Sequence, residues 1–293
     1  MPIERVGLVA KRHLDAAAPV VADLARWLEA RNVVPVFERD TAALATQSSG
    51  GETTSRDELP KRCDLIVVLG GDGTLIGMAG RIAHSGASIP ILGVNFGSLG
   101  FLTEITLPEL YPSLESVLSG TALMDERMML RARTLRGGEV YADRLVLNDT
   151  VITKGALSRI IDLAVSVDHQ PIMRVRADGL IVASPTGSSA YNLAAGGPIV
   201  HPSVDALLLT PIAPHMLTNR PVVIPGVSEV RVEPMMDGSN DEVFVTFDGQ
   251  SGHPLQAADV VSIRRADRPL RLVRASTRTY FDVLRQKLKW GER

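Results

Sequence analysis

The first third of the chain is constrained most by short apolar runs in which hydrophobic and polar residues do not alternate. Leu65–Leu69 (LIVVL) is apolar at every position. The other runs are Arg5–Ala10, Val33–Phe37 and Ile91–Val94, and segments with helical spacing lie between them at 20–28, 74–85 and 108–118. Because a strand that is buried on both faces shows no alternation, this order predicts a parallel sheet covered by helices.

After about residue 122 the pattern changes to many short β-rich segments. They are Leu130–Leu135, Val140–Leu147, Ile160–Val167, Ile172–Val175, Gly179–Ser184, Ala206–Thr210, Val230–Val232, Val243–Phe247, Val260–Ile263 and Leu270–Val273. Turn signals such as Asp248-Gly249 separate them. This density of strands predicts an antiparallel sandwich or a related all-β domain. We therefore expect an α/β domain over 1–122, an all-β domain over 123–275 and a closing helix within 276–293.

The composition limits which binding partners and which cellular compartment are expected. Of 293 residues, 45% are hydrophobic and 22% are charged, and the net charge of -2 argues against strong non-specific affinity for nucleic acid or an anionic membrane. Cys63 is the only cysteine, so no internal disulfide can form and a reducing compartment, the cytoplasm, is expected. The uncharged stretch at 179–204 contains prolines and paired glycines, which would break a membrane-spanning helix.

A glycine-rich segment follows the longest apolar run directly. Leu65–Leu69 leads into Gly70-Gly71-Asp72-Gly73-Thr74, and a helix is expected to begin there. Glycines let the backbone turn sharply and approach a ligand, and the N–H groups of a new helix bind anions. A carboxylate beside phosphates is repelled unless it binds a metal ion or handles a proton. Asp72 therefore favours phosphoryl-transfer chemistry over passive cofactor binding.

Other interpretations of this segment stay open. A plain turn with a helix-capping Asp72 would have the same local sequence. No G-x-x-x-x-G-K-[ST] P-loop occurs in the chain, and Ile76 stands where the dinucleotide fingerprint has its third glycine. A second glycine-rich turn, Gly93–Leu102, follows the next predicted strand. It is either an ordinary connection or a second ligand loop at the same edge of the sheet.

Two polar segments in the β-rich part offer hydrogen-bonding groups for a sugar and a base. Asn148-Asp149 joins an amide to a carboxylate at a strand end, although the same pair is common in turns. Ser184–Pro198 (SPTGSSAYNLAAGGP) adds hydroxyls, an amide and the aromatic face of Tyr191 in an uncharged stretch. This segment suits a nucleoside better than a core, with Tyr191 as a core side chain the alternative.

The charged side chains and the histidines of the β-rich part give weaker evidence for a functional site. Arg174, Arg176 and Asp178 lie two apart and hence on one face of a strand, where a solvated face with weak ion pairs is the alternative to a site. His201 and His215 have no cysteine or second histidine at metal-ligand spacing. No metal-ligating side chains are therefore predicted.

Taken together, these motifs resemble the NAD kinase family, and its bacterial members in particular. The matching motifs are GGDGT at 70–74, G-x-N-x-G-x-L-G-F-L at 93–102, Asn148-Asp149, D-G-L-I-x-x-[ST]-P-T-G-S-[ST]-A-Y at 178–191 and A-G-G-P at 195–198. GGDGT alone is also similar to lipid kinases and phosphofructokinases, whereas the 178–191 block together with the Asn-Asp pair is specific. The motifs match in spacing and order, and the resemblance covers nearly the whole chain.

The resemblance implies a fold and an activity. The fold would be a Rossmann-like α/β N-terminal domain and an all-β C-terminal domain, with the active site between them and a C-terminal helix packing back on the first domain. The activity would be transfer of the γ-phosphoryl group of ATP to the 2′-hydroxyl of the adenosine ribose of NAD. Since the glycine loops carry few cations, a divalent ion such as Mg²⁺ must supply positive charge. A homodimer or homotetramer is expected.

The resemblance also implies roles for single residues. Asp72 would act at the 2′-hydroxyl as general base or orienter, with Gly73 and Asn95 in the glycine loops. The remaining positions expected to hold NAD are Asn148, Asp149, Arg159, Arg176, Asp178, Ser189, Ala190, Tyr191, Asn192, Leu193, Ala194 and Gln250. The family often has Glu at position 149, and Asp149 keeps the carboxylate one methylene shorter. Arg176 matches the basic residue of bacterial relatives that favour NAD over NADH.

Rival functions share parts of this pattern. A lipid kinase uses the same GGDGT turn, but the 178–198 block and the lack of an amphipathic or basic membrane-binding segment speak against it. A non-catalytic sensor of NAD(H) would carry a similar cofactor site, and Asp72 in a phosphate loop speaks against that. A hydride-transfer oxidoreductase is disfavoured by Ile76. The sequence leaves open whether polyphosphate replaces ATP and whether NADPH or NADH inhibits.

Overall fold

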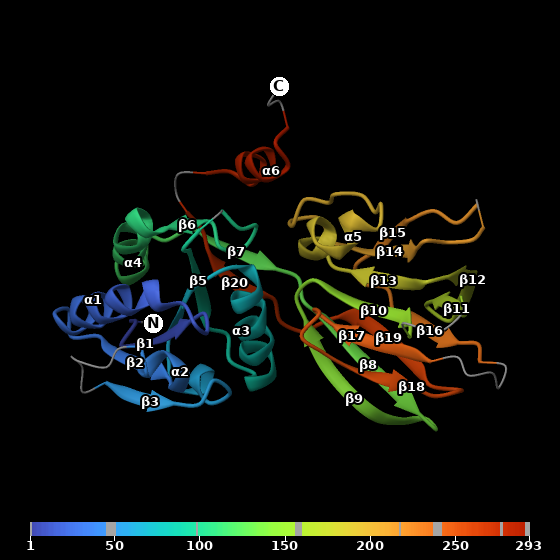
Figure 1. Cartoon of the computed structure of the whole chain (residues 1–293), viewed down its shortest axis with the longest axis horizontal. Helices are drawn as coiled ribbons and strands as arrows, with labels where there is room; N and C mark the ends of the chain where they lie inside the picture. The colour runs from blue at the N-terminus through green and yellow to red at the C-terminus, as the bar shows by residue number, and fades with distance from the viewer. Residues whose placement is uncertain are drawn as a thin grey trace. The chain divides into compact units, whose positions relative to one another are not determined.

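The computed structural model describes residues 2–44, 51–97, 99–155, 160–216, 218–236, 242–275 and 278–290. The chain divides into two units, one formed by residues 1–126 with 270–293 and the other by residues 127–269 (Figure 1). The stretch 123–275, predicted to be one all-β domain, contains two strands that join the N-terminal sheet instead. These are β7 (Met124–Arg127) and β20 (Leu270–Val273).

The N-terminal unit is built on a sheet with eight described strands in the order β3-β2-β1-β4-β5-β20-β7, with β6 paired to β5. The further strands are β1 (Arg5–Ala10), β2 (Val34–Glu38), β3 (Glu52–Thr54), β4 (Leu65–Leu69), β5 (Pro90–Asn95) and β6 (Ile105–Thr106). The helices are α1 (Ala18–Glu29), α2 (Arg39–Ala42), α3 (Asp72–Ser85), α4 (Leu110–Leu118) and α6 (Tyr280–Leu288), with short 3-10 turns η1 (Asp15–Ala17), η2 (Leu59–Lys61) and η3 (Leu107–Glu109). The pairings from β3 to β20 are parallel, which confirms the predicted architecture.

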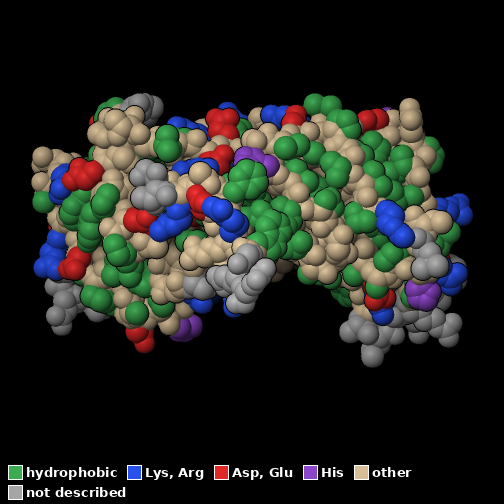
Figure 2. Space-filling model, turned by 90° about the horizontal axis from the view of Figure 1, so that it is seen from above, with side chains coloured by type: hydrophobic (Ala, Val, Ile, Leu, Met, Phe, Trp, Pro, Cys, Tyr) green, Lys and Arg blue, Asp and Glu red, His purple; other side chains and the backbone are tan. Residues whose placement is uncertain are grey.

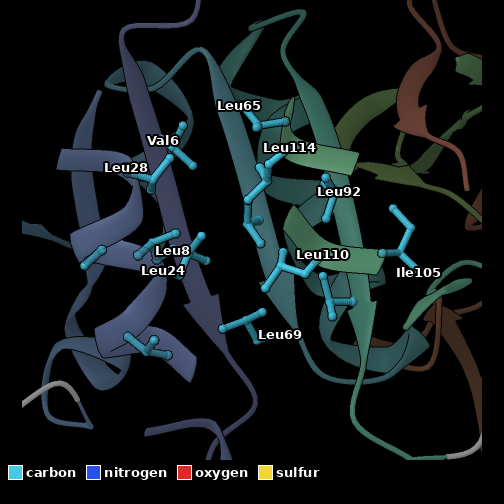
Figure 3. Packing of buried hydrophobic residues seen from close by; sticks show 14 of the residues in the cluster. Val6, Leu8, Leu24, Leu28, Leu65, Leu69, Leu92, Ile105, Leu110 and Leu114 are labelled. Atoms are coloured by element: carbon cyan, nitrogen blue, oxygen red, sulfur yellow. The ribbon is translucent and has the colours of Figure 1, made fainter. Parts of the chain in front are cut away.

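Burial on both faces explains why the strands of this sheet do not alternate. All five residues of β4 are fully buried. Leu65, Val67 and Leu69 pack with side chains of α1 and α4 in one cluster (Figure 3). Ile66 and Val68 point to the opposite face, and α3 packs against β4, β5 and β20 through side chains outside that cluster. Each such buried side chain contributes about 1.5–3 kcal/mol.

The C-terminal unit holds two antiparallel sheets of six strands each in the described part of the chain. Their orders are β15-β14-β13-β10-β17-β18 and β12-β11-β16-β19-β8-β9. The strands are β8 (Leu130–Arg136), β9 (Glu139–Val146), β10 (Asp149–Lys154), β11 (Ile161–Val167), β12 (Gln170–Ala177), β13 (Gly179–Ala183), β14 (Ala206–Ile212), β15 (Val222–Pro225), β16 (Val230–Pro234), β17 (Val243–Phe247), β18 (Ser251–Leu255) and β19 (Val260–Arg265), with η4 (Thr186–Ser189) and α5 (Tyr191–Ala194) after β13. Side chains of both sheets form one core, as the predicted all-β domain requires.

The closing helix α6 lies at the predicted residues and belongs to the N-terminal unit. Its first turn is fixed by a reciprocal cap, in which the Asp282 N–H donates to Thr279 Oγ1 and the Asp282 carboxylate accepts from the Thr279 N–H. Tyr280, Val283 and Leu284 are its buried residues. No helix in the described ranges has the length and apolarity needed to cross a lipid bilayer.

Candidate functional site

Two glycine loops of the N-terminal unit lie at one edge of its sheet. β4 runs parallel to β5 with Leu69 opposite Val94, so both strands end together. The N–H of Gly70 donates to the Val94 carbonyl at 2.9 Å, which extends the pairing into the first loop. Asp72 therefore follows β4 at the point where Asn95 ends β5. This edge, at the carboxyl ends of parallel strands, is where open α/β sheets bind ligands.

The start of α3 offers backbone donors to an anion. Gly71 is the N-cap residue, and as a glycine it has no side chain that could cap the helix. The N–H of Thr74 donates to the Gly71 carbonyl at 3.0 Å, but the N–H groups of Gly71, Asp72 and Gly73 find no acceptor in the part of the chain that the structure describes. Gly73 is exposed and adds no side chain that would cover these groups. Such unpaired N–H groups at a helix N-terminus bind phosphates.

The carboxylate of Asp72 is bound by the second glycine loop. Its Oδ2 accepts from the N–H of Phe101 at 2.8 Å. Its Oδ1 accepts from the N–H of Leu102 at 3.1 Å and from the N–H and hydroxyl of Thr103 at 3.0 and 2.9 Å. A Cβ on Gly100 would lie 2.1 Å from Asp72 Oδ1, so this contact requires glycine. The aspartate thus joins the two loops, rather than merely capping its own helix as in the plain-turn interpretation.

Asn95 extends this hydrogen-bonded group. It is 9% exposed, and its Oδ1 accepts from the N–H of Gly97 while its Nδ2 donates to Thr103 Oγ1 at 3.4 Å. Thr103 is fully buried between Asn95 and Asp72. The sequence pointed to Asp72 and Asn95 but not to Thr103, because a threonine after a Gly-Phe-Leu run carries no local sign that its hydroxyl meets a carboxylate.

In the C-terminal unit, three neighbouring strands place polar turns side by side. β10 lies between β13 and β17, with Asp149 opposite Ala183 and Thr150 opposite Phe247. Since both neighbours are antiparallel to β10, the residues that follow β13 and β17 lie beside the start of β10. This register brings the segments 147–149, 184–187 and 248–250 together.

Asp248 holds the turn that carries Asn148 and Asp149. Its Oδ2 accepts from the N–H of Leu147 at 2.8 Å, and its Oδ1 accepts from the N–H groups of Asn148 and Asp149 at 2.7 and 3.1 Å. Its φ of 50° lies in the left-handed region, which Asp tolerates better than most residues. The sequence predicts only a turn at Asp248. The signal for a further role is the run Asp248-Gly249-Gln250, because Gln250 is one of the predicted site residues.

Asp149 is buried without a hydrogen bond to its carboxyl group from any described residue. It is 5% exposed. Burial raises the pKa of Asp149 to about 7, and the nearby charge of Asp248 adds to the shift. Burial also raises the pKa of Asp248, against the lowering effect of its three backbone N–H bonds. Near neutral pH the Asp149 carboxyl can therefore act as hydrogen-bond donor or acceptor.

The segment 184–198 packs directly on this turn. The hydroxyl of Ser184 donates to the Leu147 carbonyl, and its N–H donates to the Asn148 carbonyl at 2.8 Å. A Cβ on Gly187 would lie 2.2 Å from the Asn148 carbonyl oxygen, so a side chain there would separate the two segments. These contacts seat the start of η4 on Asn148. The α5 helix follows η4 directly and packs against η4 and β13, and this stretch carries Ser189, Ala190, Tyr191, Asn192, Leu193 and Ala194.

Two residues of this segment differ in what they offer a ligand. Tyr191 is 47% exposed, which rules out the alternative that it fills the core. Asn192 is fully buried; its Nδ2 donates to the carbonyls of Ser188 and Pro198, and its Oδ1 accepts from the hydroxyl of Thr210. The amide of Asn192 is thus used within the chain, where it fixes the shape of the segment.

Of the other predicted NAD-binding positions, Asp178 and Arg176 lie apart from this cluster, whereas Gln250 belongs to the 248–250 turn beside Asp149. Asp178 is hydrogen-bonded through its backbone to Lys154 at the far end of β10, about 17 Å from Asp149 by strand geometry. Arg176, on the exposed face of β12, has its nearest carboxylate, Asp162, at 4.0 Å. Gln250 is exposed in the turn after β17. Arg159 lies outside the described residues. The described residues contain no group of three His, Cys, Asp or Glu side chains that could hold a metal ion.

Comparisons with known proteins show which family the chain resembles along its length. Residues 6–122 match the ATP-NAD kinase N-terminal domain and residues 147–275 match the ATP-NAD kinase C-terminal domain. The chain is 48% identical over 291 residues to an NAD kinase of Geotalea daltonii and 49% identical over 291 residues to one of Geobacter sulfurreducens, covering 99% of this chain and 100% of each relative.

Two solved structures show the same fold. A yeast NADH kinase complexed with NADH superposes with a TM-score of 0.91 at 24% identity, covering 100% of this chain and 89% of that one. An NAD kinase from Archaeoglobus fulgidus in complex with ATP gives a TM-score of 0.75 at 24% identity, covering 96% of this chain and 99% of that one. With both domains matched in order and near-full-length relatives at almost half identity, the chain belongs to the NAD kinase family.

Proposed function

We propose that this protein is a phosphotransferase that moves the γ-phosphoryl group of ATP to the 2′-hydroxyl of the adenosine ribose of NAD, giving NADP. The observation that carries the proposal is the carboxylate of Asp72, held in one orientation beside three unpaired N–H groups at the start of α3. A group that can handle a proton thereby stands next to an anion site. The full-length NAD kinase relatives support the same activity.

The donor phosphates would bind to the N–H groups of Gly71, Asp72 and Gly73. Phosphoryl transfer depends on alignment and on neutralising charge, because its transition state is loose. A divalent ion bound to the triphosphate would need few ligands from the protein. Bound in that way, Mg²⁺ would supply positive charge to the phosphates. The assay below tests polyphosphate as an alternative donor.

The acceptor would be bound by the residues that the sequence predicts for it, taken unit by unit. Asp72 would accept a hydrogen bond from the 2′-hydroxyl, orient its oxygen toward the γ-phosphorus and take the proton as the new O–P bond forms, while the bond to the β-phosphate oxygen breaks and ADP leaves. Asn148, Asp149 and the segment from Ser189 to Ala194 would hold the adenosine, with Tyr191 offering its exposed ring to the base. Asp248 would fix the turn of Asn148 and Asp149.

Arg176 and Asp178 would contact a different part of NAD from Asn148, because Asp178 lies beside the other end of β10 and Arg176 precedes it on β12. Gln250 and Arg159 complete the proposed NAD positions. We propose NAD rather than NADH as the preferred acceptor, since Arg176 is the basic residue associated with that choice. Comparable turnover with NADH in the assay below would reject this preference.

We propose that the enzyme is a homodimer or homotetramer and that it works in the cytoplasm. Neither nucleic acid nor a membrane is proposed as a partner. The net charge of -2 supports the absence of a strongly basic binding surface. On the face shown in Figure 2, Lys and Arg side chains are interspersed with Asp and Glu side chains. Light scattering of the purified protein measures the subunit number directly.

The test is a coupled assay. Purified protein receives NAD, ATP and Mg²⁺, and NADP is detected by a strictly NADP-dependent dehydrogenase. We expect NADP that depends on protein, ATP and magnesium. NAD binding measured by calorimetry, without NADP from either ATP or polyphosphate, would favour the non-catalytic sensor instead. Phosphorylation of a lipid acceptor in place of NAD would favour the lipid kinase, which the full-length NAD kinase relatives do not support.

A further inference from the structure

We propose that Thr103 is a positioning residue for the phosphoryl transfer, and that it assigns the two carboxylate oxygens of Asp72 to different tasks. Oδ1 is held by the chain, and Oδ2 is the oxygen presented to the acceptor hydroxyl. This inference rests on the proposed kinase function and adds to it a residue and an atomic assignment.

The count of donors distinguishes the two oxygens. A carboxylate has about four acceptor positions, two on each oxygen. Oδ1 receives three hydrogen bonds, from the N–H of Leu102 and from the N–H and hydroxyl of Thr103. Oδ2 receives one, from the N–H of Phe101. An incoming hydroxyl therefore finds an acceptor position on Oδ2 and none on Oδ1.

The hydroxyl proton of Thr103 has a fixed direction. Asn95 Oδ1 accepts from the N–H of Gly97, which turns its Nδ2 toward Thr103. Because Thr103 Oγ1 accepts from that amide at 3.4 Å, its own proton points to Asp72 Oδ1 at 2.9 Å. Thr103 is fully buried, so water does not compete for this bond. The hydrogen bonds run in one direction, from Asn95 through Thr103 to Asp72.

Thr103 provides the one side-chain donor to Asp72 among the described residues, and the other three donors belong to the backbone. The backbone donors remain when the side chain changes. The hydroxyl adds a third donor on the Oδ1 side and so opposes rotation of the carboxylate about its Cβ–Cγ bond. Loss of the hydroxyl lets Oδ2 move off the line that a reacting hydroxyl needs, and small misplacements are costly in transfer reactions.

The test compares Thr103→Val with Thr103→Ser in the coupled NADP assay. Valine keeps the shape and removes the hydroxyl, and we expect kcat to fall about ten- to a hundredfold. NAD affinity by calorimetry is expected to stay near that of the wild type, and serine is expected to restore most of kcat. Thermal unfolding of all variants checks that they fold. An unchanged kcat in Thr103→Val, or serine as slow as valine, overturns the proposal.

A double-mutant cycle separates positioning from a general structural effect. In an Asp72→Asn background there is no carboxylate to orient, so adding Thr103→Val is expected to lower the residual rate no further. An additional loss as large as in the wild-type background overturns the proposal. If the wild type makes no NADP, the kinase function and this inference fail together. If the wild type is active but the cycle is additive, the inference alone fails.

Discussion

Asp72 of the N-terminal unit and Asp149 of the C-terminal unit both follow a glycine or amide turn at a sheet edge, yet their carboxyl groups are treated in opposite ways. Asp72 is partly exposed and accepts four hydrogen bonds. Asp149 is 5% exposed and accepts none from the described residues, and burial raises its pKa to about 7. The hydrogen bonds of Asp72 fix where its carboxylate points, whereas the burial of Asp149 without such bonds favours its neutral form.

The carboxyl groups of Asp72 and Asp149 are therefore suited to different roles. A fixed carboxylate suits a reaction in which one oxygen must meet one hydroxyl. A carboxyl group that is close to half protonated near neutral pH suits a binding turn, since it can donate to one polar group of a nucleoside and accept from another. The neighbouring Asp248 combines both features, because it is partly buried, with its pKa raised by desolvation, and also accepts three backbone hydrogen bonds.

The largest effect is expected from Asp72→Asn. Its amide cannot accept a proton and turns a donor toward the backbone N–H groups of the second loop, so we expect kcat to fall about a thousandfold. NAD binding by calorimetry is expected to remain near normal. Asp64→Asn is the matched control, because Asp64 also accepts two backbone N–H bonds, from Glu4 and Arg5, but lies outside the glycine loops. A wild-type rate in Asp72→Asn would refute its catalytic role.

Gly100→Ala is expected to have the second largest effect. The added Cβ would lie 2.1 Å from Asp72 Oδ1 and 2.3 Å from Thr103 Oγ1, so the loop or the carboxylate must move. We expect kcat to fall about a hundredfold. Gly97→Ala, whose Cβ meets only Asn95 Oδ1 at 3.9 Å, is expected to cost much less. Equal losses in the two variants would show that the contact with Asp72 is not what matters at position 100.

Asp149→Asn is expected to change how stability depends on pH. The pKa of Asp149 is raised from 3.8 to about 7 on folding, so the folded state binds this proton more tightly than the unfolded chain. The contribution is full below about pH 4 and is lost as pH rises through about 7. Because asparagine has no proton to lose, the unfolding free energy of the variant is expected to rise by about 3 kcal/mol relative to the wild type as pH goes from about 5 to about 8. Urea unfolding measures this, and parallel pH curves would contradict it.

The smallest effect is expected from Asp248→Asn. Asparagine keeps one oxygen for the N–H groups of Asn148 and Asp149 but points its amide at the N–H of Leu147, which costs about 1 kcal/mol of unfolding free energy. The KM for NAD is expected to rise while kcat changes little. Asp168→Asn is the control, since Asp168 has a similar φ of 49° and bonds the N–H of Glu229 at an exposed turn. A KM that rises equally in both variants would exclude a specific role for Asp248.

Much of the fold could be predicted because its signals are local. The run Leu65–Leu69, the strand Val243–Phe247 and the helix Tyr280–Leu288 lie at the predicted residues. β15 and β18 were missed because they are edge strands that contain proline, and pairing with one neighbour holds them despite low intrinsic preference. β20 was predicted as a strand but assigned to the wrong sheet, because its apolar pattern does not reveal which strand it pairs with.

The sequence by itself determined the elements, the glycine loops and the side chains that can do chemistry there, since each depends on neighbours along the chain. Only the tertiary structure decided what those side chains touch. Asp72 meets Thr103 across 31 positions, and Asp248 meets Asn148 across 100. These contacts follow from β4 lying beside β5 and β10 lying beside β17. Strand order is set by burial of whole faces, which no short segment encodes.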